Sequence, residues 1–464
     1  MISQTCSFGT RRAGLIACFA GLAAAALTAA SLGPDLRLMD AAKSGDKKAV
    51  VALLKEKVDV NATTPGGSTP LAWAAERAND EIAQLLLAAG AKPDTANDYG
   101  ESPLTLACAN GDGQLVQKLL EAGANAKAAR WDGETALMIC SGNGNTEAVR
   151  HLLAHGADTT ATDQSKGQNA LMWAAAQGRT AVVKLLIEHG ADVNVASKGN
   201  FTPIDFAVEK GDADAIRVLA AAGADVNKAM PDGNTPILIA SNLKQPAAVA
   251  ALLDLGAKPT VADRTGNTPL HAAAQAGDAD LEKQLMAKGA DPNAKTSSIA
   301  GGRGAGAAGG GRGGPVGQQT PLMLAAKSGK LDAMKVLVAG GADPKLRAQD
   351  GSTLLMSAAS SGHVEAVKYA YELDPDPKTV FATNQIGNNA VHASVAGVGG
   401  SIPQPMVCEV IQFLADKGVE IDVKNAQGRT AIQIANGLPI DTAVTLMVNM
   451  LKAAGRTPLI DPHR

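Results

Sequence analysis

The sequence predicts an all-α array in which pairs of short helices repeat along an elongated solenoid. Three observations predict this fold class: a period near 33 residues, a Thr-Pro-Leu-like start to each period, and a glycine two residues before that start. Each period offers two short apolar stripes that are too small to enclose a core. A stable structure therefore requires neighbouring copies to cover them.

One complete copy, residues 264–297, shows how each element is specified. Thr268 is suited to cap a helix, and the proline after it suits the first turn, where no backbone N–H is needed. Gly277 ends this helix because glycine adopts the left-handed conformation without strain. A second helix then begins at Asp278 or Asp280 and carries the next apolar stripe.

The start of the repeat recurs in register at eleven positions, and a degenerate copy at residues 36–45 makes twelve. The starts are Thr69, Ser102, Thr135, Asn169, Thr202, Thr235, Thr268, Thr320, Thr353, Asn389 and Thr430. The glycine before each start predicts the left-handed residue of a hairpin turn. Asn200 and Gln318 replace this glycine in two copies, and asparagine tolerates that conformation best among other residues.

This pattern resembles the ankyrin repeat. The resemblance is carried by Thr-Pro-Leu-His-Ala-Ala at 268–273, by Gly-Ala-Asp-Val-Asn at 190–194 and 223–227, and by the period. It covers roughly residues 35–455. It implies helix–turn–helix units stacked in a curved solenoid, with hairpins projecting from one edge and a concave face made by hairpins and first helices. It also implies protein binding, and a fold with no chemistry of its own.

The chain is expected to have five parts. They are a signal peptide or membrane anchor at 1–30, repeats 1–7 at 31–295, a flexible Gly/Arg-rich insertion at 296–319, repeats 8–12 at 320–455 with insertions near 374–388 and 397–405, and a polar tail at 456–464. The glycine-rich insertion has little apolar surface to bury and much entropy to lose, so we expect a mobile tether there.

The first thirty residues read as a targeting segment. Arg11 and Arg12 precede an apolar run from Ala13 to Ala30 that ends in small residues, which is the order found in secretory signal peptides. We therefore expect export to the periplasm or the exterior. The alternative is an uncleaved membrane anchor, because the run is nearly long enough to span a bilayer.

Charge and cysteine content exclude several classes of function. The formal net charge is −3, and removing the two arginines of residues 1–30 makes it −5, so we expect neither nucleic acid nor a polybasic membrane surface as a partner. Cys108 and Cys140 fall at small apolar positions of adjacent first helices. We expect buried free cysteines there. A disulfide between them is the alternative, disfavoured by their offset of one position.

No residue pattern predicts a catalytic, cofactor or metal site. His271 and His392 occupy the histidine position of the repeat signature, where the resemblance implies a structural hydrogen bond. His151 and His155 are spaced i, i+4 but lack the paired ligands of zinc motifs. Placement of His155 near the end of a helix, where a cation is favoured, is the simpler account. An enzyme using Cys140 with either histidine is the weakest alternative.

The predicted binding residues lie at the hairpin tips and precede or flank the turn glycines. They are Tyr99, Arg130, Trp131, Lys198, Met230 and Arg264. Exposed tryptophan, tyrosine and arginine are the residues that dominate protein interfaces. In contrast, Trp73 and Trp173 take a helical packing position, where core is expected.

The leading hypothesis is an exported, monomeric, non-enzymatic scaffold that binds another protein through the concave and hairpin face. A protein that binds an envelope polymer, glycan or peptide, is the alternative, since exposed aromatic rings stack on sugars. The low aromatic content, 3%, disfavours it.

Overall fold

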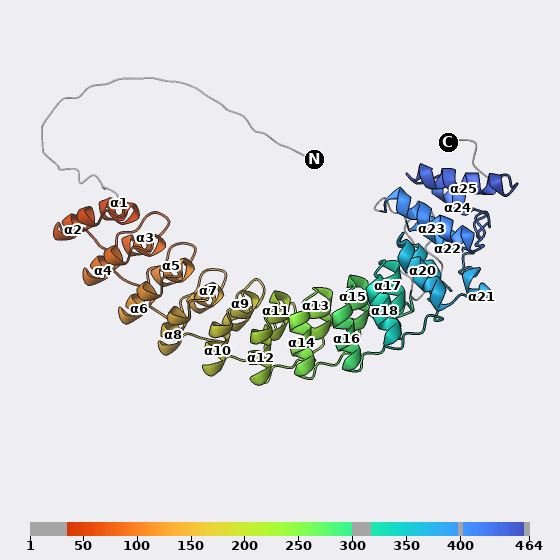
Figure 1. Ribbon diagram of the computed structural model, residues 1–464. Coiled ribbons are helices and arrows are strands. Elements are labelled where there is room, and N and C mark those ends of the chain that lie inside the picture. The colour runs from red at the N-terminus through yellow and green to blue at the C-terminus, as the bar shows by residue number, and fades with distance from the viewer. Residues whose placement is uncertain (1–34, 299–316, 398–401, 459–464) are drawn as a thin grey trace, which may run out of the picture.

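The described residues form an arc of twelve helix pairs stacked side by side (Figure 1). The computed structural model describes residues 35–298, 317–397 and 402–458. In repeats 1–9 the first helix of each pair lies on the inner side of the arc and the second helix on the outer side (Figure 1). The predicted all-α, elongated array is therefore confirmed.

The helices follow the predicted repeat closely. Repeats 1–4 contain α1 (Arg37–Ser44), α2 (Lys47–Lys55), α3 (Pro70–Glu76), α4 (Asp80–Ala88), α5 (Pro103–Asn110), α6 (Gly113–Glu121), α7 (Ala136–Asn143) and α8 (Thr146–Ala154). Repeats 5–8 contain α9 (Ala170–Ala176), α10 (Thr180–Glu188), α11 (Pro203–Lys210), α12 (Ala213–Ala221), α13 (Pro236–Asn242), α14 (Pro246–Asp254), α15 (Pro269–Ala276) and α16 (Ala279–Ala287).

The later repeats are longer and less regular. Repeats 9–12 contain α17 (Pro321–Lys327), α18 (Leu331–Ala339), α19 (Leu354–Ala359), α20 (Val364–Leu373), α22 (Ala390–Ala396), α23 (Gln404–Asp416), α24 (Ala431–Ala435) and α25 (Asp441–Ala453). The predicted break near 374–388 contains a further short helix, α21 (Pro377–Val380). Eight pairs precede the glycine-rich insertion, not seven, because the degenerate copy at 36–45 forms a full first helix.

First helices begin as the repeat signature predicts. In α3 the hydroxyl of Thr69 accepts the backbone N–H of Ala72 at 3.1 Å, and Pro70 fills the first position, where no donor is needed. In α15 Gly277 closes the helix with φ of +78°. These local choices fix the length of each helix before any packing is considered.

Second helices begin at an aspartate or asparagine in six of the described repeats. In α16 the Asp278 carboxylate accepts the N–H of Leu281 at 3.0 Å, so Asp278 is the cap and Asp280 lies inside the first turn. Leu281 and Leu285 are buried, whereas Met286, expected to join them, is only partly buried.

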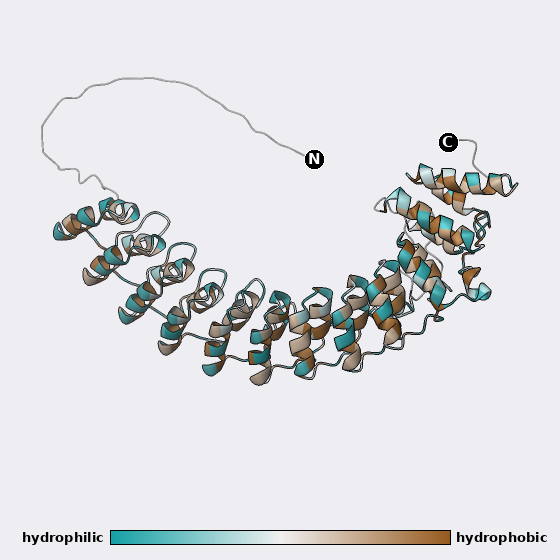
Figure 2. Ribbon diagram, in the orientation of Figure 1, coloured by the Kyte–Doolittle hydropathy of each residue, from teal (hydrophilic) through white to brown (hydrophobic). Residues whose placement is uncertain are grey.

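One continuous apolar core runs through the stack, and its members are mostly alanine, leucine and valine. Figure 2 shows most helices carrying both hydrophobic and hydrophilic residues, as an amphipathic helix must when one face meets its neighbours. Trp73 and Trp173 pack against this core but remain half-buried, so the prediction of a core position is only partly correct.

Several predicted features lie outside the described residues. They are the targeting segment at 1–30, most of the insertion at 296–319, part of the insertion at 397–405, and the end of the polar tail. Among the helices that the structure describes, none combines the length and the apolar content needed to cross a membrane.

Candidate partner-binding edge

Successive hairpins along the array are joined by backbone hydrogen bonds. We call them fingers and number each by the repeat that follows it, so finger 3 is residues 97–101 and finger 4 is residues 130–134. The N–H of Trp131 donates to the carbonyl of Tyr99 at 3.2 Å. The same bond joins Asp98 to Gly66, Gln164 to Asp132, Lys198 to Lys166, Arg264 to Asp232, Ser297 to Thr265, Gln349 to Gly317, Gln385 to Asp350 and Ala426 to Ile386.

This ladder skips one place, between fingers 6 and 7. Pro231 stands where the donor would be, and proline has no N–H. On its other side, finger 7 is joined to finger 8 twice, because the guanidinium of Arg264 donates to the carbonyl of Pro231 in addition to the ladder bond. Elsewhere the edge is held by the backbone itself, so it is formed before any partner arrives.

Fingers 3 and 4 approach so closely that only glycine fits between them. Gly100 has φ of +74°, and a Cβ there would lie 2.8 Å from the backbone nitrogen of Trp131. The predicted left-handed turn residues are confirmed, including Asn200 with φ of +65°. Gln318, an exception to the pattern for which no conformation was predicted, also has a positive φ, +54°. Asparagine and glutamine therefore occupy the conformation that glycine takes in other fingers.

Tyr99 and Trp131 are exposed at adjacent fingertips, at 66% and 69% of their maximal areas. The bond between the Trp131 N–H and the Tyr99 carbonyl fixes their backbones beside each other. Their predicted exposure is confirmed, and the structure brings the two together. Their role in binding stays a prediction.

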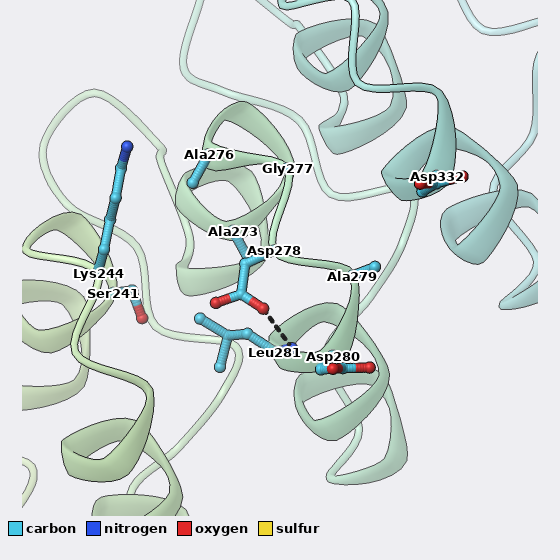
Figure 3. Close-up of a pocket in the computed structure, with 10 residues that line it drawn as sticks. All are labelled: Ser241, Lys244, Ala273, Ala276, Gly277, Asp278, Ala279, Asp280, Leu281 and Asp332. Atoms are coloured by element: carbon cyan, nitrogen blue, oxygen red, sulfur yellow. Dashed lines mark hydrogen bonds between the residues drawn. The ribbon is translucent and has the colours of Figure 1, made fainter.

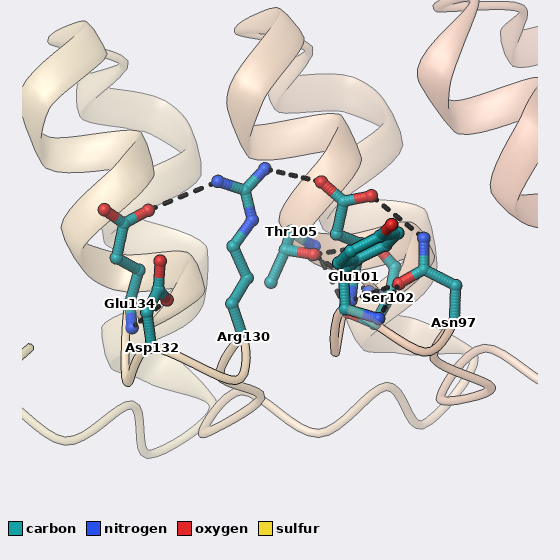
Figure 4. Close-up of polar contacts among 8 residues, drawn as sticks. Asn97, Glu101, Ser102, Thr105, Arg130, Asp132 and Glu134 are labelled. Atoms are coloured by element: carbon teal, nitrogen blue, oxygen red, sulfur yellow. Dashed lines mark hydrogen bonds and ion pairs between the residues drawn. The ribbon is translucent and has the colours of Figure 1, made fainter. Parts of the chain in front are cut away.

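Arg130 braces these fingers and is not free at their surface. Its guanidinium contacts the carboxylate of Glu101 at 3.0 Å and that of Glu134 at 3.2 Å (Figure 4). The Glu101 carboxylate also accepts the side-chain amide of Asn97 at 2.9 Å. Sequence reasoning expected an exposed arginine, but the two carboxylates hold its half-buried side chain against the molecule.

The other three predicted residues lie on separate fingers. Lys198, on finger 6, donates to the carbonyl of Gln164, and Arg264, on finger 8, donates to Pro231. Met230, on finger 7, is half-buried. The structure therefore spreads these residues along the edge and does not gather them with Tyr99 and Trp131.

A disulfide joins the first helices of repeats 3 and 4. Cys108 on α5 and Cys140 on α7 are fully buried, as predicted, but they are bonded, which corrects the expectation of free thiols. Their Cα atoms lie 4.8 Å apart, inside the range that a disulfide spans. The close packing of α5 and α7 therefore overcomes the offset of one position that disfavoured this pairing in the sequence.

A cleft of about 480 Å³ opens at the opposite ends of the first helices, between repeats 7 and 8 (Figure 3). It is lined by Lys244, Asp278, Asp280 and Asp332 together with small residues of α15. The Asp278 carboxylate is already engaged in capping α16. Among the residues that the structure describes, no group of three or more histidine, cysteine or acidic side chains is arranged to hold a metal.

Comparison with known proteins gives the family. Residues 38–130, 111–197, 137–230, 204–296 and 316–403 match the family described as ankyrin repeats (3 copies), which together is well over half of the chain. The chain belongs to the ankyrin-repeat family. The matches identify ankyrin repeats and no catalytic domain.

Two curated relatives share only a short part of this ankyrin array. A stretch of 65 residues is 45% identical to the mitochondrial disaggregase of Bos taurus, and covers 14% of this chain and 10% of that protein. A stretch of 86 residues is 36% identical to the mitochondrial disaggregase of Homo sapiens, and covers 18% of this chain and 12% of that protein. The chain thus spans about a tenth of the length of these relatives.

The two signature histidines of the ankyrin repeats are structural, as the resemblance implied. The Nε2 atom of His271 lies 3.0 Å from the carbonyl of Gln319, and that of His392 lies 3.3 Å from the carbonyl of Arg429. Each bond crosses to the next repeat. Burial lowers the pKa of both imidazoles, so they remain neutral at physiological pH.

The histidine pair considered for a metal has a simpler role at a helix end. Nδ1 of His155 donates to the carbonyl of His151 at 2.8 Å, in the last turn of α8. His189 makes the same contact with Leu185 in α10. Each imidazole shares its carbonyl with the backbone N–H of the same histidine, so both rings add a second bond at a helix end.

Sequence reasoning missed a buried carboxyl in the stack. Glu282 on α16 is fully buried, and neither of its side-chain oxygens has a hydrogen-bond partner. Burial, with a smaller contribution from the charge of Asp278, raises its pKa to about 8. Aligning the second helices would have found it, because the same position holds Val50, Ala83, Val116, Val149, Val183, Ile216, Val249, Met334 and Val367 elsewhere.

Three exposed apolar side chains were also missed. They are Leu243, Phe381 and Ile386. Ile386 lies on finger 11, and an apolar residue directly before the turn glycine was the signal that could have revealed it. Phe381 follows α21, an element that the repeat pattern could not predict.

Proposed function

We propose that this protein is a non-enzymatic, exported ankyrin scaffold that binds another protein through its fingers and concave face. The observation that carries this proposal is the pair of exposed aromatic side chains, Tyr99 and Trp131, on a finger ladder that the backbone already holds in place. Large rigid side chains on a preformed surface lose little entropy on binding.

Two features support export. Residues 1–30 carry the charged, apolar and small-residue order of a signal peptide. The Cys108–Cys140 disulfide fits an oxidising compartment such as the periplasm or the exterior. Sequencing the N-terminus of the mature protein tests this part, since a start near Ser31 is expected and a start at Met1 would favour the membrane-anchor alternative.

Photocrosslinking in cells tests the binding surface. A benzophenone side chain is placed at Tyr99 or, as the matched control, at Glu147, which is exposed on the outer helix α8. We expect discrete protein adducts from position 99 and none from position 147. Equal labelling from both positions, or none from either, would contradict the proposal.

A second candidate is a protein that binds an envelope glycan. The same Tyr99–Trp131 pair favours it, because aromatic faces stack on sugar rings. Cosedimentation with purified envelope polymer measures this directly. Retention that depends on both aromatic residues would replace the protein-binding proposal.

A further inference from the structure

We propose that fingers 3 and 4 dock a stretch of partner polypeptide in which lysine or arginine residues alternate with apolar ones. This inference rests on the proposed function and names the chemistry of the partner. Three observations support it. Tyr99 and Trp131 are held in fixed register, carboxylates outnumber cations around them, and Arg130, the one arginine of these two fingers, is already paired with Glu101 and Glu134.

The aromatic pair has a fixed geometry. The backbone bond from Trp131 to Tyr99 and the close approach at Gly100 hold the two fingertips together. In the ladder Asp98 takes the same place as Trp131, and Tyr99 takes the same place as Asp132. Each fingertip therefore carries one aspartate next to one aromatic residue, and the order of the two is reversed between finger 3 and finger 4.

Charge is concentrated at these two fingers. They contain four carboxylates, Asp98, Glu101, Asp132 and Glu134, and one guanidinium, Arg130, which leaves three negative charges. Each remaining described finger carries between one negative and one positive charge. The most acidic stretch of the edge is thus also the stretch with two exposed aromatic side chains.

Arg130 does not neutralise the carboxylates that lie beside the exposed rings. Both of its outer nitrogens are engaged by Glu101 and Glu134. Asp98 is exposed beside Tyr99, and Asp132 lies beside Trp131 with one oxygen accepting the N–H of Glu134 at 3.1 Å. The carboxylates nearest the rings are therefore the ones available to a cation from outside.

A lysine or arginine fits this arrangement better than other groups. A cation can lie over an aromatic face and contact a carboxylate at the same time, and each contact strengthens when water is excluded. The protein already contains such a contact, because Lys43 Nζ lies 4.3 Å from the ring centre of Trp73. Apolar residues between the cations would cover the remaining ring surface. Nucleic acid, which is polyanionic, would be repelled.

Fluorescence anisotropy with a labelled peptide tests the proposal on the full-length protein. The probe is Lys-Leu-Arg-Leu-Lys, and the matched probe is Glu-Leu-Asp-Leu-Glu. We expect the basic peptide to bind, with affinity falling as salt rises, and the acidic peptide not to bind. Tyr99→Ala/Trp131→Ala and Asp98→Asn/Asp132→Asn should each weaken binding about tenfold.

The control variant is Glu147→Gln/Glu188→Gln, which removes two exposed charges from the outer helices α8 and α10. It should change the affinity less than about twofold, because both charges lie on second helices and not on the fingers, and salt screens charges that do not touch the peptide. Equal losses in this variant and in the aspartate variant would show that only overall charge matters and would overturn the proposal. Salt-independent binding of a neutral oligosaccharide through Tyr99 and Trp131 would overturn it as well.

The test separates this inference from the proposed function. Protein adducts at position 99 without binding of the basic peptide would leave the scaffold function standing and remove the partner class. Finger-dependent binding of the peptide without protein adducts would do the reverse. Circular dichroism of each variant confirms that a loss of binding is not a loss of fold.

Discussion

Repeats 3 and 4 are joined very differently from repeats 7 to 9, although both are built from the same unit. Between repeats 3 and 4 the contacts include the Cys108–Cys140 disulfide, the Arg130–Glu101 ion pair and the finger bond to Tyr99. Asn143 adds two bonds from its side-chain amide to carbonyls at the end of α5, at 2.8 and 3.1 Å.

Repeats 7 to 9 keep the finger bonds, and Lys288 pairs with Asp254 across repeats 7 and 8, but among the described residues they have no disulfide. A cleft of about 480 Å³ opens at the surface between repeats 7 and 8, where Ala276 stands in place of Asn143. Glu282 puts an unpartnered carboxyl into the core of the same region. The comparison shows that the repeat signature determines the backbone of each unit, whereas residues outside the signature determine how strongly adjacent repeats are held together. We call each contact between adjacent repeats a joint. In a stack where stability is a sum over neighbours, opening starts at the weakest joint.

Removing the disulfide should have the largest effect. Cys108→Ala/Cys140→Ala releases a cross-link between residues 32 apart, which should cost about 3 to 4 kcal/mol through the greater entropy of the unfolded chain. Urea unfolding under oxidising conditions measures the change, with Cys408→Ala, a free thiol, as the control. An unchanged urea midpoint would mean that the disulfide does not stabilise the contact between repeats 3 and 4.

Replacing the buried carboxyl should strengthen the weak joint. The folded-state pKa of Glu282, about 8, lies above its ordinary value of 4.5. Below pH 4.5 the Glu282 carboxyl is mostly neutral in both the folded and the unfolded state. Between these pH values the unfolded chain ionises first and stability falls, and above pH 8 the loss is complete. Glu282→Val should therefore stabilise the protein by about 2 to 3 kcal/mol at pH 9. At pH 4 the gain should be much smaller, because the carboxyl is then neutral in both the folded and the unfolded state.

The same position in the preceding repeat provides the matched test. Val249→Glu should introduce a loss of stability with rising pH that the native protein lacks at that joint, because Val249 is also fully buried. Urea midpoints for both variants from pH 4 to pH 9 measure it. Parallel pH profiles for the native protein and Glu282→Val would contradict the role assigned to this carboxyl.

Disturbing the finger contact should have a smaller effect. Gly100→Ala and Gly428→Ala both place a side chain at positive φ, but only the Cβ at 100 meets a neighbouring finger. We expect a cost of about 2 kcal/mol at Gly100 and about 1 kcal/mol at Gly428. Thermal melts compare the two, and equal costs would show that finger proximity adds nothing to the strain of the turn.

Removing the arginine brace should have the smallest effect. Arg130→Met breaks two ion pairs whose partners are partly shielded from water, and should cost about 1 kcal/mol. Arg264→Met, on finger 8, should cost less than about 0.5 kcal/mol, since that side chain is exposed and makes no ion pair with any described residue. Thermal melts again measure both, and a larger loss for Arg264 would reverse the proposed ranking of the two regions.

Much of the fold could be predicted because its signals are local. The Thr268 cap, the closing Gly277 and the left-handed turn residues depend on the conformational preferences of a few neighbouring residues. The position of Asn200 in the repeat predicted its positive φ, although asparagine adopts that conformation less readily than glycine. The exposure of Tyr99 and Trp131 followed from the same register.

The remaining features depend on contacts between repeats, which a period does not specify. The sequence by itself determined the helices, the turns, the stacking of the pairs and which residues stand at the fingertips. Only the tertiary structure decided that Cys108 bonds to Cys140, that Arg130 is clamped by Glu101 and Glu134, and that Glu282 is buried without a partner. The physical reason is that capping and turn conformation act within a few residues, whereas side chains meet across a joint according to the separation and rotation of two packed helices.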